Sequence, residues 1–215
     1  KEIVDLKSKY NFRLLVDDAH GFGTMGETGA GTGEAQGCQD GIDLYFSTFA
    51  KSMASIGAFI SGEKEVIWYL RYNLRSQIYA KSLPMPIVIG NLKRLELLRS
   101  KPELKAKLWD NVNKLQDGFR SRGFDLGNTH RPGTRVFLQV CMPEAINLVV
   151  DLRENHGIFC SAVTYPVIPK GMLMLRIIPT SSHTDDDIQK TLDAFSAIRE
   201  KINSGAYLKE DLVKI

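Results

Sequence analysis

The sequence predicts an α/β protein in which part of a mostly parallel sheet is followed by a smaller α+β domain. Three observations lead to this class. A helical apolar pattern at residues 1–10 runs directly into the apolar segment Phe12–Val16, as in a crossover unit. Eight of the 18 glycines then fall between Gly21 and Gly41. From Pro102 onward, helical and strand patterns follow one another in the manner of a small packed domain.

The composition is that of a globular protein and excludes several functional classes. Of the 215 residues, 43% are hydrophobic and 25% charged, which suffices to build a core. The formal charge of +3 lacks the basic bias of a nucleic-acid binder, and no apolar run approaches the ~20 residues of a membrane helix. Cys38, Cys141 and Cys160 lie too far apart for a disulfide framework or a metal site, so we expect no metal and buried thiols in a reducing cytoplasm.

The start of the chain resembles the middle of a longer one. No initiator Met is present, and the first helix–strand pair lacks the strand that should precede it. Two further strands are predicted at Leu44–Phe49 and Ala58–Ser61. Three strands cannot form the wide sheet that such apolar runs imply, so we expect the C-terminal part of a longer α/β protein.

Helical patterns dominate the middle of the sequence. Residues from Trp68 to about Arg99 favour helix, with a break at Leu83–Pro86, where two prolines end or start a segment. Thr184 and Asp187 have the spacing of a capping box. The remaining predicted elements are a helix from Pro102 to about Arg122, a strand at Arg135–Cys141, a helix at Glu144–His156, strands at Ile158–Ser161 and Met172–Ile178, and a helix at Asp185–Ile202.

The first cluster of chemically useful side chains follows the strand that ends near Val16. Asp17, Asp18 and His20 lie at the point where ligands bind in parallel sheets. Gly21-x-Gly23-x-x-Gly26 also matches the dinucleotide fingerprint, with an acidic residue at a suitable distance in Asp43. That motif must open a helix, however, and three more glycines by residue 33 leave no room for a helix of useful length.

The second cluster surrounds Lys51, which follows the strand at Leu44–Phe49. This lysine lies between hydroxyl residues and a glycine-containing return, so we expect a desolvated, nucleophilic amine suited to Schiff-base chemistry. Pyridoxal phosphate requires a carboxylate for its ring nitrogen and a lysine for its imine. Asp17 and Lys51, on two strand ends 34 residues apart, match that requirement.

Several motifs together resemble the α-oxoamine synthases, a family of fold-type I pyridoxal-phosphate enzymes. They are Asp17-Asp-Ala-His20, Thr48-Phe-Ala-Lys51-Ser, Gly57-Ala-Phe, Ser82-Leu-Pro and Leu175-Arg176. The resemblance runs from about residue 3 to residue 202, and family chains are nearly twice as long as this one. It implies a C-terminal portion of the large cofactor-binding domain at residues 1–80, a connecting helix at 81–101 and a small α+β domain at 102–215.

The resemblance also implies a role for each matching side chain. Asp17 would bind the protonated ring nitrogen, His20 the phenolic oxygen and Thr48 the phosphate; Lys51 would form the imine and abstract the Cα proton; Arg176 would bind the substrate carboxylate; and Ser82 would contact the phosphate in the neighbouring subunit. Departures from the family pattern occur at Ala50, where many members have Ser, and at Ala80 and Lys81, beside Ser82. A third is Thr164, where some bacterial serine palmitoyltransferases have a second arginine.

The activity that the resemblance implies is condensation of an amino acid with an acyl-CoA to an amino ketone, in a cytoplasmic homodimer with its active site at the subunit interface. Apolar residues around Tyr165–Pro169 favour a serine palmitoyltransferase-like enzyme. The alternatives are 2-amino-3-ketobutyrate CoA ligase (glycine C-acetyltransferase) and 8-amino-7-oxononanoate synthase. Two other classes are a non-catalytic partner subunit, against which the presence of Lys51 argues, and a nucleotide-binding module, which would show no imine absorbance.

Overall fold

The computed structural model describes residues 1–209 and divides into two compact units, residues 1–105 and the part from Ala106 onward. The division falls within helix α6 (Pro102–Ser121). The mixture of helices and sheets confirms the predicted α/β class. The three sequence-based domain ranges stay a prediction, and residues 210–215 of the last range lie outside the described residues.

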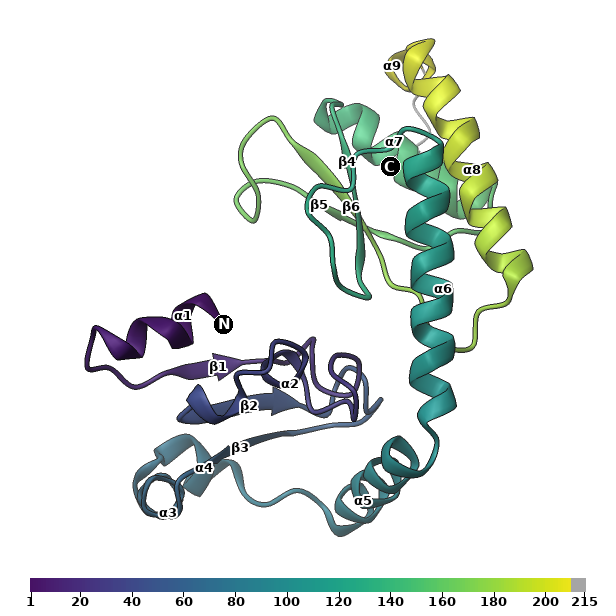
Figure 1. The fold of residues 1–215 in the computed structure, drawn as a ribbon. Coiled ribbons are helices and arrows are strands. Elements are labelled where there is room, and N and C mark those ends of the chain that lie inside the picture. Colours follow the sequence, from purple (N-terminus) through teal and green to yellow (C-terminus); the bar gives the residue numbers. More distant parts are fainter. Residues whose placement is uncertain (210–215) are drawn as a thin grey trace. The chain divides into compact units, whose positions relative to one another are not determined.

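The first unit contains a three-stranded sheet in the order β1-β2-β3 (Figure 1). Strands β1 (Leu15–Asp17) and β2 (Leu44–Thr48) are parallel, whereas β3 (Ala58–Gly62) is antiparallel to β2. All three predicted strands form, but β1 does not begin at Phe12. The amide of Leu14 donates to Oδ2 of Asp43 at 2.7 Å and not to a neighbouring strand. Strand pairing therefore begins at Leu15.

The helices of the first unit are shorter than the sequence predicts. The break predicted at Leu83–Pro86 is confirmed, because α5 begins at Met85 with Pro84 as its N-cap, but Leu74 is extended and adds a second break that the sequence does not predict. Lys81 has a φ of 68°, a left-handed conformation that ends α4. The elements are α1 (Glu2–Asp5), a 3-10 turn (Leu6–Ser8), α2 (Thr32–Ala35), a 3-10 turn (Gln39–Gly41), α3 (Lys64–Asn73), α4 (Arg75–Ala80) and α5 (Met85–Ser100).

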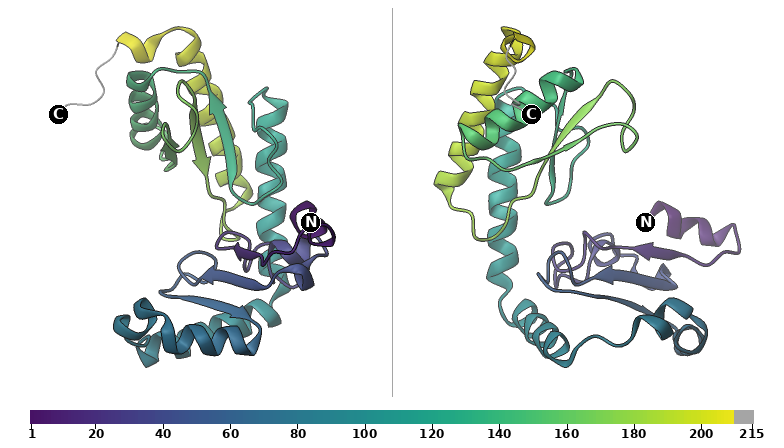
Figure 2. Two further views of the ribbon diagram at one scale, coloured as in Figure 1. Left: turned by 90° about the vertical axis from the view of Figure 1, so that its left-hand side faces the viewer. Right: turned by 180° about the vertical axis from the view of Figure 1, so that it is seen from behind.

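The second unit is an antiparallel sheet packed against helices. Its strand order is β4-β6-β5, with β4 (Thr134–Leu138), β5 (Ser161–Val163) and β6 (Leu173–Ile177). Apolar side chains of the strands share one buried cluster with α6, α7 (Met142–Glu154) and α8 (Asp185–Asn203), and α9 (Ala206–Lys209) adds Tyr207. Helices α6 and α8 lie side by side (Figure 2), and the rings of Phe119 and Phe195 meet edge to face at 4.9 Å between centroids.

All three strands of the second unit have bounds that differ from the prediction, and the largest differences are at the start of β5 and the end of β4. Strand β5 begins at Ser161 and not at Ile158, because the Ile158 amide donates to the Leu152 carbonyl and closes the end of α7. Strand β4 ends at Leu138, because Cys141 already caps α7, its amide donating to Oε2 of Glu144 at 2.9 Å.

The expectation of three buried thiols is wrong for two of the cysteines. Cys141, at the cap of α7, is exposed, and Cys38 is partly exposed. Cys160 is buried, and burial raises the pKa of its thiol to about 11, so it stays protonated and unreactive near neutral pH. All three cysteines are free.

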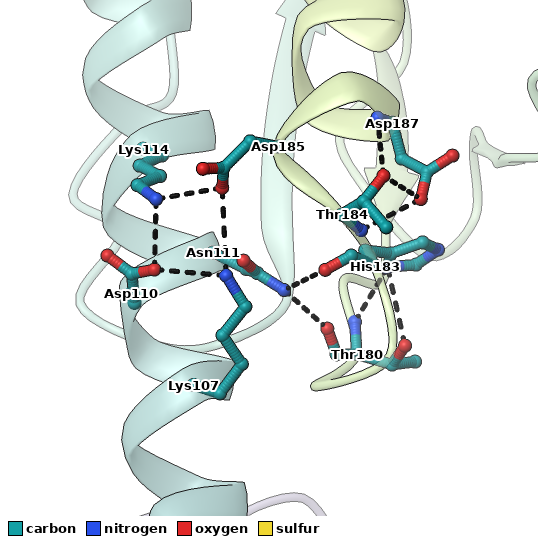
Figure 3. Close-up of polar contacts among 9 residues, drawn as sticks. All are labelled: Lys107, Asp110, Asn111, Lys114, Thr180, His183, Thr184, Asp185 and Asp187. Atoms are coloured by element: carbon teal, nitrogen blue, oxygen red, sulfur yellow. Dashed lines mark hydrogen bonds and ion pairs between the residues drawn. The ribbon is translucent and has the colours of Figure 1, made fainter.

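The start of α8 is fixed by a network of polar contacts (Figure 3). Thr184 and Asp187 form the predicted capping box, with the Thr184 amide donating to Oδ2 of Asp187 at 2.8 Å. Nδ1 of His183 accepts from the Thr180 amide at 3.0 Å, a structural role.

Helix α6 contacts the start of α8. Nδ2 of Asn111 on α6 donates to the carbonyls of Thr180 and His183, each at 2.9 Å. Ion pairs among Lys107, Asp110, Lys114 and Asp185 join the same two helices.

In the part of the chain that the structure describes, every helix is too short or too polar to cross a membrane.

Candidate active site

The carboxyl ends of β1 and β2 bring the predicted cofactor residues of the first unit to one edge of its sheet. Asp17 is the last residue of β1 and pairs with Phe46, and Thr48 is the last residue of β2. Lys51 follows three residues later, in the turn between β2 and β3. Because β1 and β2 are parallel, both strand ends face the same side.

Asp17 presents an oriented, exposed carboxylate at this edge. Its Oδ1 accepts a hydrogen bond from the Ala19 amide at 3.0 Å, which fixes the direction of the side chain. Within residues 1–209 no cationic group forms an ion pair with Asp17. His20 follows on the same loop and is also exposed, and its carbonyl accepts from the Thr24 hydroxyl at 2.8 Å.

Asp18 has a different role, which the sequence does not reveal. Its side chain is buried, and its two oxygens accept hydrogen bonds from the Thr32 amide and the Thr32 hydroxyl, both at 2.6 Å. The hydroxyl of Tyr45 donates to Oδ2 of Asp18 at 3.0 Å. Burial and the charge of Asp18 raise the pKa of Tyr45 above its usual range, so this hydroxyl keeps its proton. Asp18 therefore closes the glycine-rich loop behind Asp17.

The glycines allow this loop to close tightly around Asp18. A methyl group added at Gly21 would lie 2.2 Å from Oδ1 of Asp18, and one added at Gly31 would lie 2.1 Å from Oδ2. Gly31 also has a φ of 110°, which only glycine adopts readily. The glycines thus serve internal packing.

The dinucleotide interpretation fails in the structure. Helix α2 spans only Thr32–Ala35 and begins after Gly26, so the loop does not open a helix of useful length. Asp43 lies just before the first residue of β2, at the end opposite Thr48, where it pairs with Lys7 and Arg13. These cations hold the pKa of Asp43 far below its usual range, and the residue is a structural ion-pair partner.

A compact turn presents Lys51. The Thr48 hydroxyl donates to the Gly57 carbonyl at 3.0 Å and accepts from the Ala50 amide at 3.1 Å. Met53 is buried and anchors the turn, while the Ser52 hydroxyl donates to the Phe22 carbonyl at 2.6 Å, attaching it to the glycine-rich loop. The expectation of a desolvated Lys51 is wrong for this chain, because the residue lies near the tip of the turn and is exposed.

Ser82 is far from this turn in sequence, but its neighbour Leu83 packs on the base of the turn. It is exposed and precedes Leu83, whose side chain packs on Gly57: a methyl group at Gly57 would lie 2.8 Å from Cδ1 of Leu83. Gly57 has a φ of 103°. Lys81, with its positive φ, directs the chain into this contact.

The remaining predicted site residue, Arg176, belongs to the second unit. It is exposed on β6, between Leu175 and Ile177, which are buried. Its strand partners are Arg135 on β4 and Ser161 on β5. Thr164 lies just after β5, and its hydroxyl contacts the Tyr165 carbonyl at 3.4 Å.

Comparison with known proteins identifies the fold. The model of the family "Aminotransferase class I and II" matches residues 1–195. The chain is 65% identical over 207 residues to a cysteate-C-fatty acyltransferase of Capnocytophaga ochracea, covering 96% of the chain and 49% of the relative. It is 36% identical over 192 residues to a serine palmitoyltransferase of Sphingobacterium spiritivorum, covering 89% and 48%.

A solved serine palmitoyltransferase structure described as holding a PLP internal aldimine superimposes with a TM-score of 0.85 at 29% identity, covering 94% of this chain and 51% of that one. The chain therefore spans about half the length of the relatives that it matches. The expected resemblance to the α-oxoamine synthases is confirmed. On the family match over residues 1–195, this chain belongs to the aminotransferase class I and II family.

Proposed function

We propose that the protein is a pyridoxal-phosphate-dependent acyltransferase that condenses an amino acid with a fatty acyl-CoA, and that the amino acid is cysteate. The observation that carries the reaction class is the placement of Asp17 and Lys51 at one edge of a parallel strand pair. The choice of cysteate over serine rests on the 65% identity to the cysteate enzyme, against 36% to the serine enzyme.

The residues at this edge fit pyridoxal phosphate. The carboxylate of Asp17 is oriented by the Ala19 amide and has no cationic partner within the described residues, so it suits a protonated ring nitrogen. Lys51 supplies the only amine on the turn after β2, and its exposure leaves Nζ accessible to an aldehyde. When bound, the cofactor supplies an electron sink for negative charge at the amino-acid Cα.

The chain's own residues then bind, orient and move protons. Asp17 keeps the proton on the ring nitrogen, and Asp18 holds the loop that positions Asp17 and His20. Lys51 would hold the cofactor through its amine and would accept the Cα proton of the amino acid. His20 binds the cofactor's phenolic oxygen, and Arg176 binds the substrate carboxylate.

Thr48 has one hydroxyl proton, and in this structure it goes to the Gly57 carbonyl. Binding of the cofactor phosphate by Thr48 therefore requires this proton to change acceptors. Ser82, exposed near the same turn, keeps its proposed contact with a phosphate in a homodimer.

The overall reaction consumes one proton, which solvent supplies and which ends on the CoA sulfur, and needs no further reactant. A bond forms between the amino-acid Cα and the acyl carbon, and the thioester C–S bond breaks to release the CoA thiol. The α-carboxylate leaves as carbon dioxide, and the side-chain sulfonate of cysteate stays in the product. We place this reaction in the cytoplasm, as the free cysteines favour.

The test uses the full-length protein with added cofactor, palmitoyl-CoA and either cysteate or serine, with products identified by mass spectrometry. We expect the sulfonated amino ketone as the main product. Lys51→Ala should abolish turnover, whereas Lys64→Ala, at the start of α3, should leave it unchanged. Undiminished turnover by Lys51→Ala would refute the reaction class, and a preference for serine would refute only the choice of amino acid.

A further inference from the structure

Two arginines face each other across the sheet of the second unit. Arg135 on β4 pairs directly with Arg176 on β6, and Ser161 on β5 pairs with Arg176 from the other side. Directly opposed residues of antiparallel strands project from the same face of a sheet. One row across three strands therefore carries two guanidinium groups and a hydroxyl.

This row lies on the face turned away from the helices. The adjacent pair Val136 and Leu175 is fully buried in the cluster that the strands share with α6, α7 and α8. Because side chains alternate along a strand, Arg135 and Arg176 project from the opposite face. Arg176 is exposed there and Arg135 is half-buried.

The arrangement is unfavourable without an anion. Like charges directly opposite each other destabilise a sheet, and a buried donor without an acceptor adds a further cost. Nε of Arg135 is buried and lacks a hydrogen-bond partner among residues 1–209. Along the chain up to residue 209, neither guanidinium forms an ion pair with an acidic side chain.

We propose that this arginine pair binds an amino acid with two acidic groups, in which Arg176 takes the α-carboxylate and Arg135 takes the side-chain anion. The proposal rests on the proposed function, where that anion is the sulfonate of cysteate. Cα atoms of directly opposed residues are about 4.5–5.5 Å apart, a spacing comparable with that of the two acidic groups of one small amino acid. The planar forks of the two guanidiniums suit the oxygens of a carboxylate and a sulfonate.

The proposal makes Arg135 a specificity-determining residue. Serine offers Arg176 the same carboxylate as cysteate but leaves Arg135 without an anion. A site with a polar group left unpaired by the competing substrate discriminates strongly against it. The sulfonate, unlike the carboxylate, is also retained in the product, so the contact with Arg135 should persist after the reaction.

The test compares Arg135→Gln and Arg176→Gln in the full-length enzyme, with cysteate and serine each varied at saturating palmitoyl-CoA. We expect Arg135→Gln to lower kcat/KM for cysteate about 30- to 1,000-fold and for serine less than about threefold. Arg176→Gln should lower both. Arg135→Lys, which keeps the charge without the fork, should recover part of the loss. Arg120→Gln, on α6 and paired with Asp117, is the matched control and should change neither.

Other outcomes would overturn the proposal. An equal loss for both amino acids, together with a lower melting temperature, would make Arg135 structural. With palmitoyl-CoA varied at saturating cysteate, a raised KM for palmitoyl-CoA alone would assign the pair to the phosphates of CoA.

A binding readout separates this inference from the proposed function. 3-Sulfopropanoate carries both acidic groups but no amine, so calorimetry can follow its binding without turnover. Binding by the unsubstituted protein and at least a tenfold weaker affinity in Arg135→Gln would support the arginine pair even if no acyltransferase activity were found. Equal affinity in both would contradict it.

Discussion

Asp18 and Thr32 are joined by two hydrogen bonds of 2.6 Å, one from the amide and one from the hydroxyl of Thr32. These bonds join residues 14 positions apart and close the glycine-containing chain between them into a loop behind Asp17. The two adjacent aspartates point to different sides of the chain, so one is exposed and the other is buried. The buried Asp18 therefore positions Asp17, although the side chain of Asp18 does not itself face the sheet edge.

Replacing Asp18 should loosen this loop. In Asp18→Asn an amide NH2 group replaces one of the two accepting oxygens, leaving a donor of Thr32 or Tyr45 without its acceptor. We expect a loss of about 1–3 kcal/mol of local stability and weaker cofactor binding. Hydrogen exchange of residues 21–35 and a cofactor titration would measure both. Tyr45→Phe, which removes one hydroxyl, should show a smaller loss; unchanged exchange in Asp18→Asn would contradict this account.

Substitutions of Thr48 test whether the Gly57 carbonyl and the cofactor phosphate compete for the proton of its hydroxyl. Thr48→Ser keeps a hydroxyl that can donate to Gly57, so the turn and cofactor affinity should change little. Thr48→Val keeps the shape and removes the hydroxyl, and should destabilise the turn by about 1 kcal/mol. If Thr48 also binds phosphate, Thr48→Val should weaken pyridoxal phosphate more than pyridoxal, measured by absorbance titration. Equal weakening of both would assign Thr48 to the turn alone.

Both the backbone conformation at Gly57 and the contact with Leu83 disfavour a larger residue at this position. Gly57→Ala places a methyl group against Leu83 and forces a φ of 103° on a residue with a Cβ, which costs about 1–3 kcal/mol. We expect reduced turnover, because the turn that carries Lys51 shifts. Adding Leu83→Ala should relieve the clash but not the backbone strain, so recovery should be partial. Full activity of Gly57→Ala would show that the turn tolerates displacement.

Asp151 should make the second unit sensitive to acid. Its side chain is fully buried, and although burial opposes ionisation, Lys201, the Tyr207 hydroxyl and Asn155 together hold its pKa below the usual value. A carboxyl with a lowered pKa in the folded state stabilises the fold above its unfolded pKa of about 3.9. That contribution disappears as the pH falls through the lower, folded-state pKa.

Hydrogen exchange of α7 and α8 would measure this effect. Asp151→Asn should destabilise these helices by about 1–3 kcal/mol at pH 7 and reduce their loss of stability between pH 5 and pH 2. Asp117→Asn, at an exposed position, is the control and should change the stability by less than about 0.5 kcal/mol. An unchanged loss of stability in acid in Asp151→Asn would refute the claim that Asp151 causes this loss.

The sequence predicts those features that local patterns determine. The capping box of Thr184 and Asp187 depends on a spacing of three residues, and it forms as predicted. The start of β5 depends on the Ile158 amide, which donates to the Leu152 carbonyl at the end of α7. The pattern of apolar residues does not indicate this hydrogen bond. The role of Asp18 depends on Tyr45, 27 residues away, so it requires the fold.

The sequence indicates only in part where Arg135 lies on its sheet. A charged residue between the buried Thr134 and Val136 marks a strand face that is not core, as Arg176 does in β6. That the two arginines face each other depends on the register of β4 against β6, which neither strand specifies alone. Likewise, the exposure of Lys51 follows from the shape of its turn and not from its neighbours in sequence.

The central claim is that Lys51 forms the covalent bond to pyridoxal phosphate. Borohydride reduction of the full-length protein with bound cofactor, followed by peptide mass spectrometry, tests this claim most directly. Reduction makes the imine permanent, so we predict a single phosphopyridoxyl group on the peptide that contains Lys51 and none in Lys51→Ala. A reduced cofactor on another lysine, or no label on Lys51 in a protein that turns over its substrates, would contradict the account.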